Sequence, residues 1–193
     1  MSNLTFFEGV LKASKVTGAI APSGKALAEK ITDMAELQDA RVIVEFGTGT
    51  GAFTEVILRK KHPEAHFISF EVNPDFVKEA RKRCPDAKII EDSAENAGAH
   101  LKEAGFDHCD VIVSSLPWTC FDAELQDNIL NSAYDIIRPG GRFLTFAYFM
   151  SPYMSNGKRF LRGKLPERFD NVVQSRHIWL NIPPCTVFIA DKH

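Results

Sequence analysis

The sequence predicts an α/β domain in which helices cover both faces of a mostly parallel sheet. Two observations support this prediction: apolar runs rich in β-branched residues alternate with segments of helical periodicity, and the first run, residues 42–46, leads directly into three alternating glycines, Gly47, Gly49 and Gly51. A strand, a tight turn and a helix in succession form the repeating unit of a parallel sheet. With 193 residues and 45% hydrophobic content, the chain suits one domain over residues 1–193.

The first part of the chain supplies three helices and two strands, and one of these helices begins at the glycine loop between the two strands. Residues 22–37 carry apolar side chains at helical spacing and precede the first strand; these are Leu27, Ile31 and Met34. Residues 66–70 form the second apolar run. Asn73 is a favoured N-cap and Pro74 a favoured first-turn residue, so they open a helix that stops at Cys84.

The middle of the chain continues the alternation. Residues 88–91 are the third run, and Ser93 caps a helix that extends toward Leu101. Residues 110–114 are the fourth strand. A long amphipathic helix follows, marked by Leu125, Ile129, Leu130, Ala133, Ile136 and Ile137.

The last third completes a seven-stranded sheet whose last strand is antiparallel. The turn at residues 139–141 leads into a fifth strand over residues 142–149. Residues 171–180 and 185–190 are two extended runs joined by a turn that contains two prolines, which indicates a closing antiparallel pair.

A carboxylate stands at the end of each of the first three strands. Glu45 precedes the glycines, Glu71 follows the second run and Asp92 follows the third. The carboxyl ends of parallel strands meet at one edge of a sheet, where ligands bind. A carboxylate accepts hydrogen bonds from two neighbouring hydroxyls, and Glu45 would repel a pyrophosphate. An NAD site and a mere helix-capping glycine turn with surface acids remain as alternatives.

This combination of a glycine loop and three acids resembles the class I S-adenosylmethionine-dependent methyltransferases, which have a Rossmann-like fold. The resemblance implies that the glycine loop carries the methionine part of the cofactor, that Glu71 holds both ribose hydroxyls and that Asp92 reaches the adenine amino group. The cofactor-binding residues that it implies are Ile20, Ser23, Glu45, Gly47, Thr48, Gly49, Gly51, Glu71, Val72, Asp92, Ser93 and Ser114.

Two further segments narrow the resemblance. Residues 15–28, with Gly-Ala-Ile-Ala-Pro-Ser at their centre, and the Ser-Ser-Leu-Pro-Trp sequence of residues 114–118 are similar to the bacterial phospholipid N-methyltransferases, relatives of the rRNA adenine dimethylases. The Arg-Pro-Gly-Gly turn at 138–141 fits the same family but, like the glycine loop, is common to the whole superfamily. Membership would imply methyl transfer to the amine of phosphatidylethanolamine, toward phosphatidylcholine. We also expect residues 1–38 to form a helical segment that covers the cofactor and substrate sites.

The candidate catalytic residues follow the fourth strand. In related amine methyltransferases this loop carries a backbone carbonyl that faces the target nitrogen, and adenine-modifying members begin it with Asn or Asp. Ser115 at that position argues against a nucleobase as the acceptor. Leu116, Pro117 and Trp118 match the apolar residue, proline and aromatic residue that form the pocket wall in those members. An ordinary turn with a packed tryptophan is the alternative.

We expect direct displacement, in which the amine attacks the sulfonium methyl in line. Tyr148 is a candidate proton acceptor or orienting group, although a buried core hydroxyl fits the pattern equally. His177 is a weaker candidate. The aromatic rings of Trp118, Phe121 and Tyr148 are candidates to hold a methylated cation.

The charge pattern predicts a phospholipid partner. Residues 158–168 carry five cations and one acid, and an apolar helical face near the start of the chain comprises Leu4, Phe6, Phe7, Val10 and Leu11. Together they suit a membrane surface of anionic lipids and phosphatidylethanolamine. The alternative is that the helix packs on the domain and the basic stretch is a solvated loop.

Other features limit the classes of function. No apolar run reaches the length of a membrane span and no signal peptide is recognisable, so we expect a cytoplasmic protein or one peripheral to the inner face of the membrane. The four cysteines lack C-x-x-C spacing, so no metal site is expected. An RNA adenine N6-methyltransferase and a non-catalytic protein that binds the cofactor or a lipid remain as alternatives, the former opposed by Ser115 and by the lack of a basic nucleic-acid domain.

Overall fold

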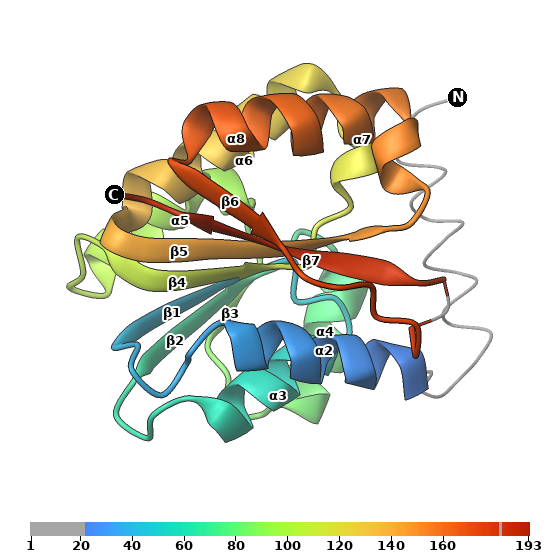
Figure 1. The fold of residues 1–193 in the computed structure, drawn as a ribbon. Helices are drawn as coiled ribbons and strands as arrows, with labels where there is room; N and C mark the ends of the chain where they lie inside the picture. The colour runs from blue at the N-terminus through green and yellow to red at the C-terminus, as the bar shows by residue number, and fades with distance from the viewer. Residues whose placement is uncertain (1–21, 182) are drawn as a thin grey trace.

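A seven-stranded sheet forms the middle of three layers in the computed structural model, which describes residues 22–181 and 183–193 (Figure 1). The strand order is β3-β2-β1-β4-β5-β7-β6, and β7 runs antiparallel to both of its neighbours, whereas the pairs from β3 to β5 are parallel. The strands are β1 (Val42–Phe46), β2 (His66–Phe70), β3 (Ile89–Ile90), β4 (Cys109–Ser114), β5 (Ile137–Tyr148), β6 (Asn171–Gln174) and β7 (Cys185–Asp191). The predicted fold class, with its antiparallel last strand, is confirmed.

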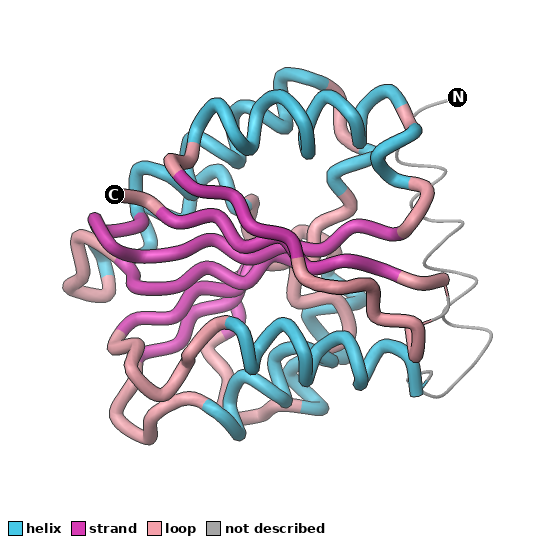
Figure 2. Tube along the Cα trace, in the orientation of Figure 1, coloured by secondary structure: helices cyan, strands magenta, loops and turns pink. Residues whose placement is uncertain are grey.

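Helices cover both faces of the sheet (Figures 1 and 2). One face carries α2 (Pro22–Met34), α3 (Ala52–Lys60) and α4 (Pro74–Arg83). The other carries α5 (Ala97–Glu103), α6 (Ala123–Ile136), α7 (Ser155–Arg159) and α8 (Leu165–Arg168). Short turns of 3₁₀ type are η1 (Ala94–Asn96), η2 (Trp118–Cys120) and η3 (Ser151–Tyr153), and the π-type turn η4 (Phe160–Lys164) joins α7 to α8. No helix among the described residues is long and apolar enough to cross a bilayer.

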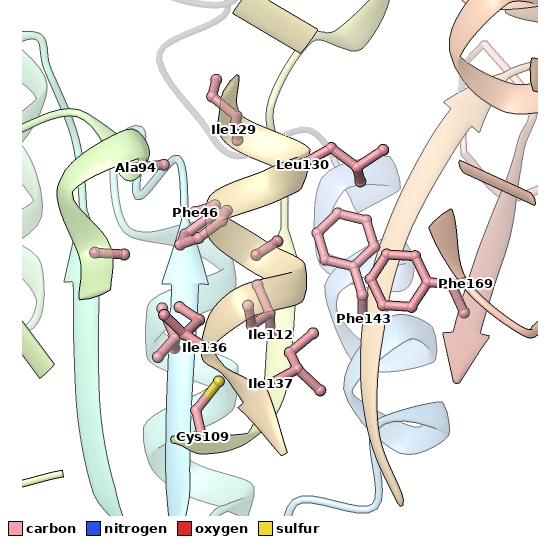
Figure 3. Packing of buried hydrophobic residues seen from close by; sticks show 14 of the residues in the cluster. Phe46, Ala94, Cys109, Ile112, Ile129, Leu130, Ile136, Ile137, Phe143 and Phe169 are labelled. Carbon is pink, nitrogen blue, oxygen red and sulfur yellow. The ribbon is translucent and has the colours of Figure 1, made fainter. Parts of the chain in front are cut away.

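The two layers of helices pack on alternate residues of the central strands, because successive side chains of a strand point to opposite faces. Phe46, Ile112 and Phe143 face α6, where they meet its buried residues Ile129 and Leu130 (Figure 3). On the opposite face, the packed residues include Ile43, Val111 and Leu144 of the sheet with Ile31 and Ile57 of α2 and α3. Each such side chain contributes about 1.5–3 kcal/mol by leaving water.

The predicted helix starts are confirmed. The Asn73 side chain accepts a hydrogen bond from the N–H of Asp75 at 2.9 Å, with Pro74 in the first turn. The Ser93 hydroxyl accepts from the N–H of Glu95 at 3.3 Å. These caps fix where the chain leaves β2 and β3, and so fix the edge of the sheet that carries Glu71 and Asp92.

Several predicted boundaries are wrong for identifiable reasons. The helix expected over residues 22–37 ends at Met34, because Glu36 adopts a left-handed backbone with φ 52°. The third strand has two residues, since it pairs with β2 alone at the sheet edge. The fifth strand begins at Ile137, earlier than expected, because the Gly140 N–H donates to the carbonyl of Lys192 and keeps the turn paired.

The last third of the chain differs most from expectation. The extended run 171–180 pairs with β7 only over Asn171–Gln174, and farther along a single bridge joins Ile178 to Cys185. The basic stretch 158–168 is helical and buries Phe160, Leu161 and Leu165, so it is no solvated loop. Phe6 and the other apolar residues of positions 4–11 lie outside the described residues, as does most of the helical segment expected over 1–38.

Candidate active site

The glycine loop after β1 is the base of the candidate site. Gly47, Gly49 and Gly51 have φ of 83°, 54° and 85°, a left-handed backbone that favours glycine. The N–H groups of Gly47 and Thr48 both donate to the carbonyl of Phe70 at the end of β2, at 2.9 and 3.1 Å. A Cβ on Gly47 would lie 3.0 Å from Leu116 Cδ2. The loop is therefore held against both β2 and the segment that follows β4.

Glu45 lies beneath this loop with no exposed surface. Its Oε2 accepts hydrogen bonds from the hydroxyls of Thr54 and Ser69, both at 2.7 Å, and the Ser69 hydroxyl also pairs with that of Thr48. Oε1 has no hydrogen-bond partner among the described residues. Burial raises the pKa of Glu45 to about 8, so the group carries a proton at neutral pH. Glu45 thus joins β1, β2 and α3 under the loop.

Glu71 presents its carboxylate at the end of β2, next to the glycines. Its Oε2 accepts from the N–H of Gly49 and its Oε1 from the N–H of Asn73, both at 2.9 Å. The residue is 8% exposed, and each oxygen keeps acceptor capacity because a carboxylate oxygen accepts about two bonds. Val72 beside it is an exposed apolar side chain. This pair can meet a ribose edge and an apolar ring face.

Asp92 is held by partners that the sequence did not indicate. Its Oδ1 accepts from the N–H of Ser93 at 2.7 Å and from the amide of Asn96 at 2.9 Å, and its Oδ2 lies 2.8 Å from Nε2 of His100. The hydrogen bond from His100 lowers the pKa of Asp92 most. The Ser93 hydroxyl donates to Glu95, at the start of the helical turn it caps. The carboxylate is therefore oriented by η1 and α5.

The segment after β4 is tied to the glycine loop. Ser114 is buried at the strand end, where its hydroxyl accepts from the N–H of Leu116 at 3.4 Å. The Ser115 hydroxyl donates to the carbonyl of Gly47, and the Ser115 N–H donates to the carbonyl of Phe46 at 2.9 Å. A shift of one segment would therefore move the other.

Trp118 is both a core residue and part of the site. It is 4% exposed, its Nε1–H donates to Thr145 Oγ1 at 3.1 Å, and its ring stacks on Phe160 at 4.0 Å and 8°. One ring face is thus covered by Phe160 and cannot hold a cation. Phe121 packs edge-on against Trp118, with centroids 5.9 Å apart.

A cavity of about 420 Å³ opens beside this segment. Its lining is mostly apolar, and no Asp, Glu, Lys or Arg among the described residues belongs to it; the lining residues are Ser115, Leu116, Pro117, Trp118, Thr119, Cys120, Phe146, Ala147, Tyr148, Met150, Ser151, Met154, Gly157, Leu161 and Pro183. Phe121, expected in the aromatic wall, does not line it. Burial raises the pKa of Tyr148, so its hydroxyl stays protonated at neutral pH.

The structure brings most of the expected residues to one edge of the sheet, but some lie elsewhere or were missed. Ile20 lies outside the residues that the structure describes. Ser23 lies in the first turn of α2, where the structure describes its backbone but not its side chain. Sequence reasoning missed Thr54, Ser69 and His100. A polar residue inside an apolar run, such as Ser69, was an available signal, whereas the pairing of His100 with Asp92 depends on how α5 returns to the sheet.

Comparison with known proteins identifies the class. Residues 43–141 match the family model described as a methyltransferase domain. The chain belongs to this family, and it is a class I S-adenosylmethionine-dependent methyltransferase. It is 30% identical over 141 residues to an ornithine lipid N-methyltransferase from Singulisphaera acidiphila, which covers 72% of this chain and 73% of that protein.

Solved structures show the same fold. The O-methyltransferase from Bacillus cereus in complex with SAH has a TM-score of 0.71 at 14% identity, over 98% of this chain and 90% of that one. An S-adenosylmethionine-dependent O-methyltransferase from Thermotoga maritima has a TM-score of 0.63 at 16% identity, over 86% of this chain and 64% of that one. At such identities the likeness concerns the fold alone.

The residues present fit S-adenosylmethionine. The left-handed Gly49 has no atom within 4 Å of where a Cβ would stand, so the loop leaves open space there. Glu71 offers unused acceptor capacity beside this space, and the Glu45 carboxyl keeps one unpartnered oxygen beneath it. Glu71 suits the ribose hydroxyls and the loop backbone suits the methionine part. The expected adenine contact of Asp92 must coexist with its bonds to Asn96 and His100.

Proposed function

We propose that this methyltransferase acts on the amine of a membrane lipid, with phosphatidylethanolamine as the acceptor. The observation that carries the proposal is the apolar cavity that adjoins the Ser115–Trp118 segment, which is itself bonded to the glycine loop. An apolar lining favours an amine attached to a lipid over a polyanionic nucleic acid. The ornithine lipid N-methyltransferase to which the chain is similar supports the same class of acceptor. Ornithine lipid is therefore the second amine to test as a substrate.

The chain's own residues position the reaction and control the proton. S-adenosylmethionine supplies an activated methyl group on its sulfonium. The glycine loop and Glu71 orient that group, and the segment from Ser115 holds the amine in line with it. An ammonium cannot attack, and a cavity without an ionised side chain disfavours the ammonium form, so the amine loses its proton to solvent on entry. Tyr148 keeps its proton and orients the amine instead of acting as the base.

Radiolabel transfer from S-adenosylmethionine tests the proposal. Wild-type protein is offered phosphatidylethanolamine, ornithine lipid and total RNA in parallel, and we expect label in the amino lipids and none in RNA. Label in RNA alone would overturn the proposal and favour the adenine methyltransferase. Binding of the cofactor without transfer to any acceptor would favour a non-catalytic binder.

A matched pair of variants tests whether the cavity is the acceptor site. Met154→Trp places a large ring in the lining, and we expect at least a tenfold loss of lipid methylation with unchanged affinity for S-adenosylmethionine. Val173→Trp changes an exposed residue of β6 that does not line the cavity and should leave the rate within about twofold. Equal rates in the two variants would remove the cavity from the reaction.

A further inference from the structure

Exposed apolar side chains lie in the two chain segments next to the acceptor cavity, and one of them, Met150, lines it. After β5, the chain exposes Phe149, Met150 and Tyr153, the last at 69%. Before β7, it exposes Trp179 at 68% and Leu180 at 80%. We call these five residues the apolar rim. Large apolar side chains gathered on one surface mark an interaction site more often than isolated ones do.

The backbone holds the rim in place. The Ile178 N–H donates to the carbonyl of Cys185 at 2.8 Å, and the buried Asn181 side chain donates to the carbonyl of Pro183 at 2.7 Å. His177 bonds Thr186 and joins the two segments, because its ring contacts both Trp179 and Phe149, with centroids 5.6 and 5.7 Å apart. Both segments lie at the same end of the sheet, where β5 ends and β7 begins (Figures 1 and 2).

The rim adjoins a basic surface. In the sequence, residues 148–166 and 171–184 contain no Asp or Glu, and their cations are Lys158, Arg159, Arg162, Lys164 and Arg176. Lys164 pairs with Asp127, and Arg159 bonds Asn156. Lys158 and Arg162 line an open groove along α7 and η4, which Asp127 and Glu167 also line, and neither cation has a side-chain hydrogen bond or ion pair with another described residue. These cations are free to meet an anionic partner.

We propose that the apolar rim docks into the interfacial layer of an anionic bilayer, with Lys158, Arg162 and Arg176 against the lipid phosphates. Trp and Tyr favour that layer because their rings are apolar and their N–H or O–H reaches water. Met150 belongs to both the rim and the cavity lining. Pro183 also lines the cavity, and it lies in the same segment before β7 as Trp179. A lipid amine therefore enters the cavity without crossing water. This inference rests on the proposed lipid acceptor.

Vesicle binding tests the docking surface without chemistry. Cosedimentation uses phosphatidylglycerol–phosphatidylcholine vesicles, which offer no amine acceptor. We expect the double variant Trp179→Ser with Leu180→Ser to bind at least fivefold more weakly than wild type, whereas Val173→Ser, an exposed apolar residue of β6, should bind normally. Equal binding by wild type and the double variant would overturn the proposal. So would a rim-dependent dimer that ignores vesicles.

The charged part of the surface has its own control. Lys158→Gln with Arg162→Gln should weaken binding at low salt several-fold, because exposed cations act through screened attraction to anionic lipid. Lys78→Gln with Lys82→Gln removes two exposed cations from α4, on the opposite face, and should change little. Equal losses in both pairs would show general charge attraction and would overturn the assigned surface.

A monomeric substrate separates this inference from the proposed function. With a short-chain phosphatidylethanolamine below its micelle concentration, the rim double variant should keep wild-type methylation, whereas it should lose at least fivefold on vesicles. Wild-type protein that docks on vesicles but methylates neither form would refute the proposed function and leave docking supported. If the double variant lost methylation of both the monomeric lipid and the vesicle lipid, weaker docking could not be the cause of the loss, and the docking proposal would be overturned.

Discussion

Glu45 and Glu71 stand at the ends of neighbouring strands, yet their carboxyl groups meet opposite surroundings. Glu45 is fully buried and bonded to two hydroxyls, which favours its neutral form. Glu71 accepts from the N–H of Gly49 in the glycine loop and from the N–H of Asn73 after β2, and these two bonds fix the orientation of its carboxylate. The first therefore supports the loop from below, and the second keeps acceptor capacity beside the open space at Gly49, which suits the ribose hydroxyls.

Glu71→Ala should weaken S-adenosylmethionine binding by about five- to a hundredfold, which corresponds to ~1–3 kcal/mol for lost charge-assisted hydrogen bonds. Calorimetry measures the dissociation constant. Glu71→Gln keeps one acceptor oxygen and should lie between wild type and Ala. The exposed Glu64→Ala is the control and should bind normally. Normal affinity in a folded Glu71→Ala variant would place the ribose elsewhere.

At the scale of the element, the sequence predicted what local chemistry determines. Asn73 and Ser93 carry their own capping oxygens, and the glycine loop carries its own left-handed positions, so both could be predicted from a few neighbouring residues. The helical path of residues 155–168 depends instead on burying Phe160 against Trp118, a contact between distant segments. The end of β6 at Gln174 likewise depends on how the chain meets β7.

The same limit applies to the site. The positions of Glu45, Glu71 and Asp92 at strand ends followed from the pattern of apolar runs. The hydrogen bond from Ser115 to Gly47 and the pairing of His100 with Asp92 did not, because each joins elements that only the folded sheet brings together. The cavity could not be predicted either, since it lies between η2, the end of β5 and α7.

Gly157 decides how closely α7 approaches the segment before it. A Cβ there would lie 2.0 Å from the carbonyl oxygen of Ser151 and 2.9 Å from Thr119 Cγ2. Gly157→Ala should therefore destabilise the protein by ~1–3 kcal/mol through overpacking. Denaturant unfolding measures the change, and methylation should fall as the cavity lining shifts.

Gly163 supplies the matched control on the same helical segment. The nearest atom to its added Cβ is Glu167 Oε1 at 3.8 Å, an ordinary contact. Gly163→Ala should be neutral or should stabilise by up to ~1 kcal/mol, because alanine loses less backbone entropy in a helix. Opposite signs for the two glycines are the expected result. Equal effects would mean that the Ser151 contact does not limit the helix.

For the whole molecule, the buried Glu45 makes folding stability depend on pH. Its pKa is about 8 when folded, against an ordinary value of 4.5, so the folded state binds the proton more tightly. The contribution to stability is complete below about pH 4.5 and is lost as pH rises toward 8, because the unfolded chain ionises first. The loss amounts to at most about 1.4 kcal/mol per pH unit in that window.

Glu45→Gln keeps the shape of the neutral carboxyl and removes its titration. We expect the free energy of unfolding of this variant, relative to wild type, to increase steadily from pH 5 to pH 8, as measured by urea unfolding at fixed ionic strength. Glu64→Gln, at an exposed position, should give a nearly constant difference over the same range. A constant difference for Glu45→Gln would mean that Glu45 is ionised in the folded protein. In that case solvent or a cation would have to reach the oxygen of Glu45 that has no hydrogen-bond partner among the described residues.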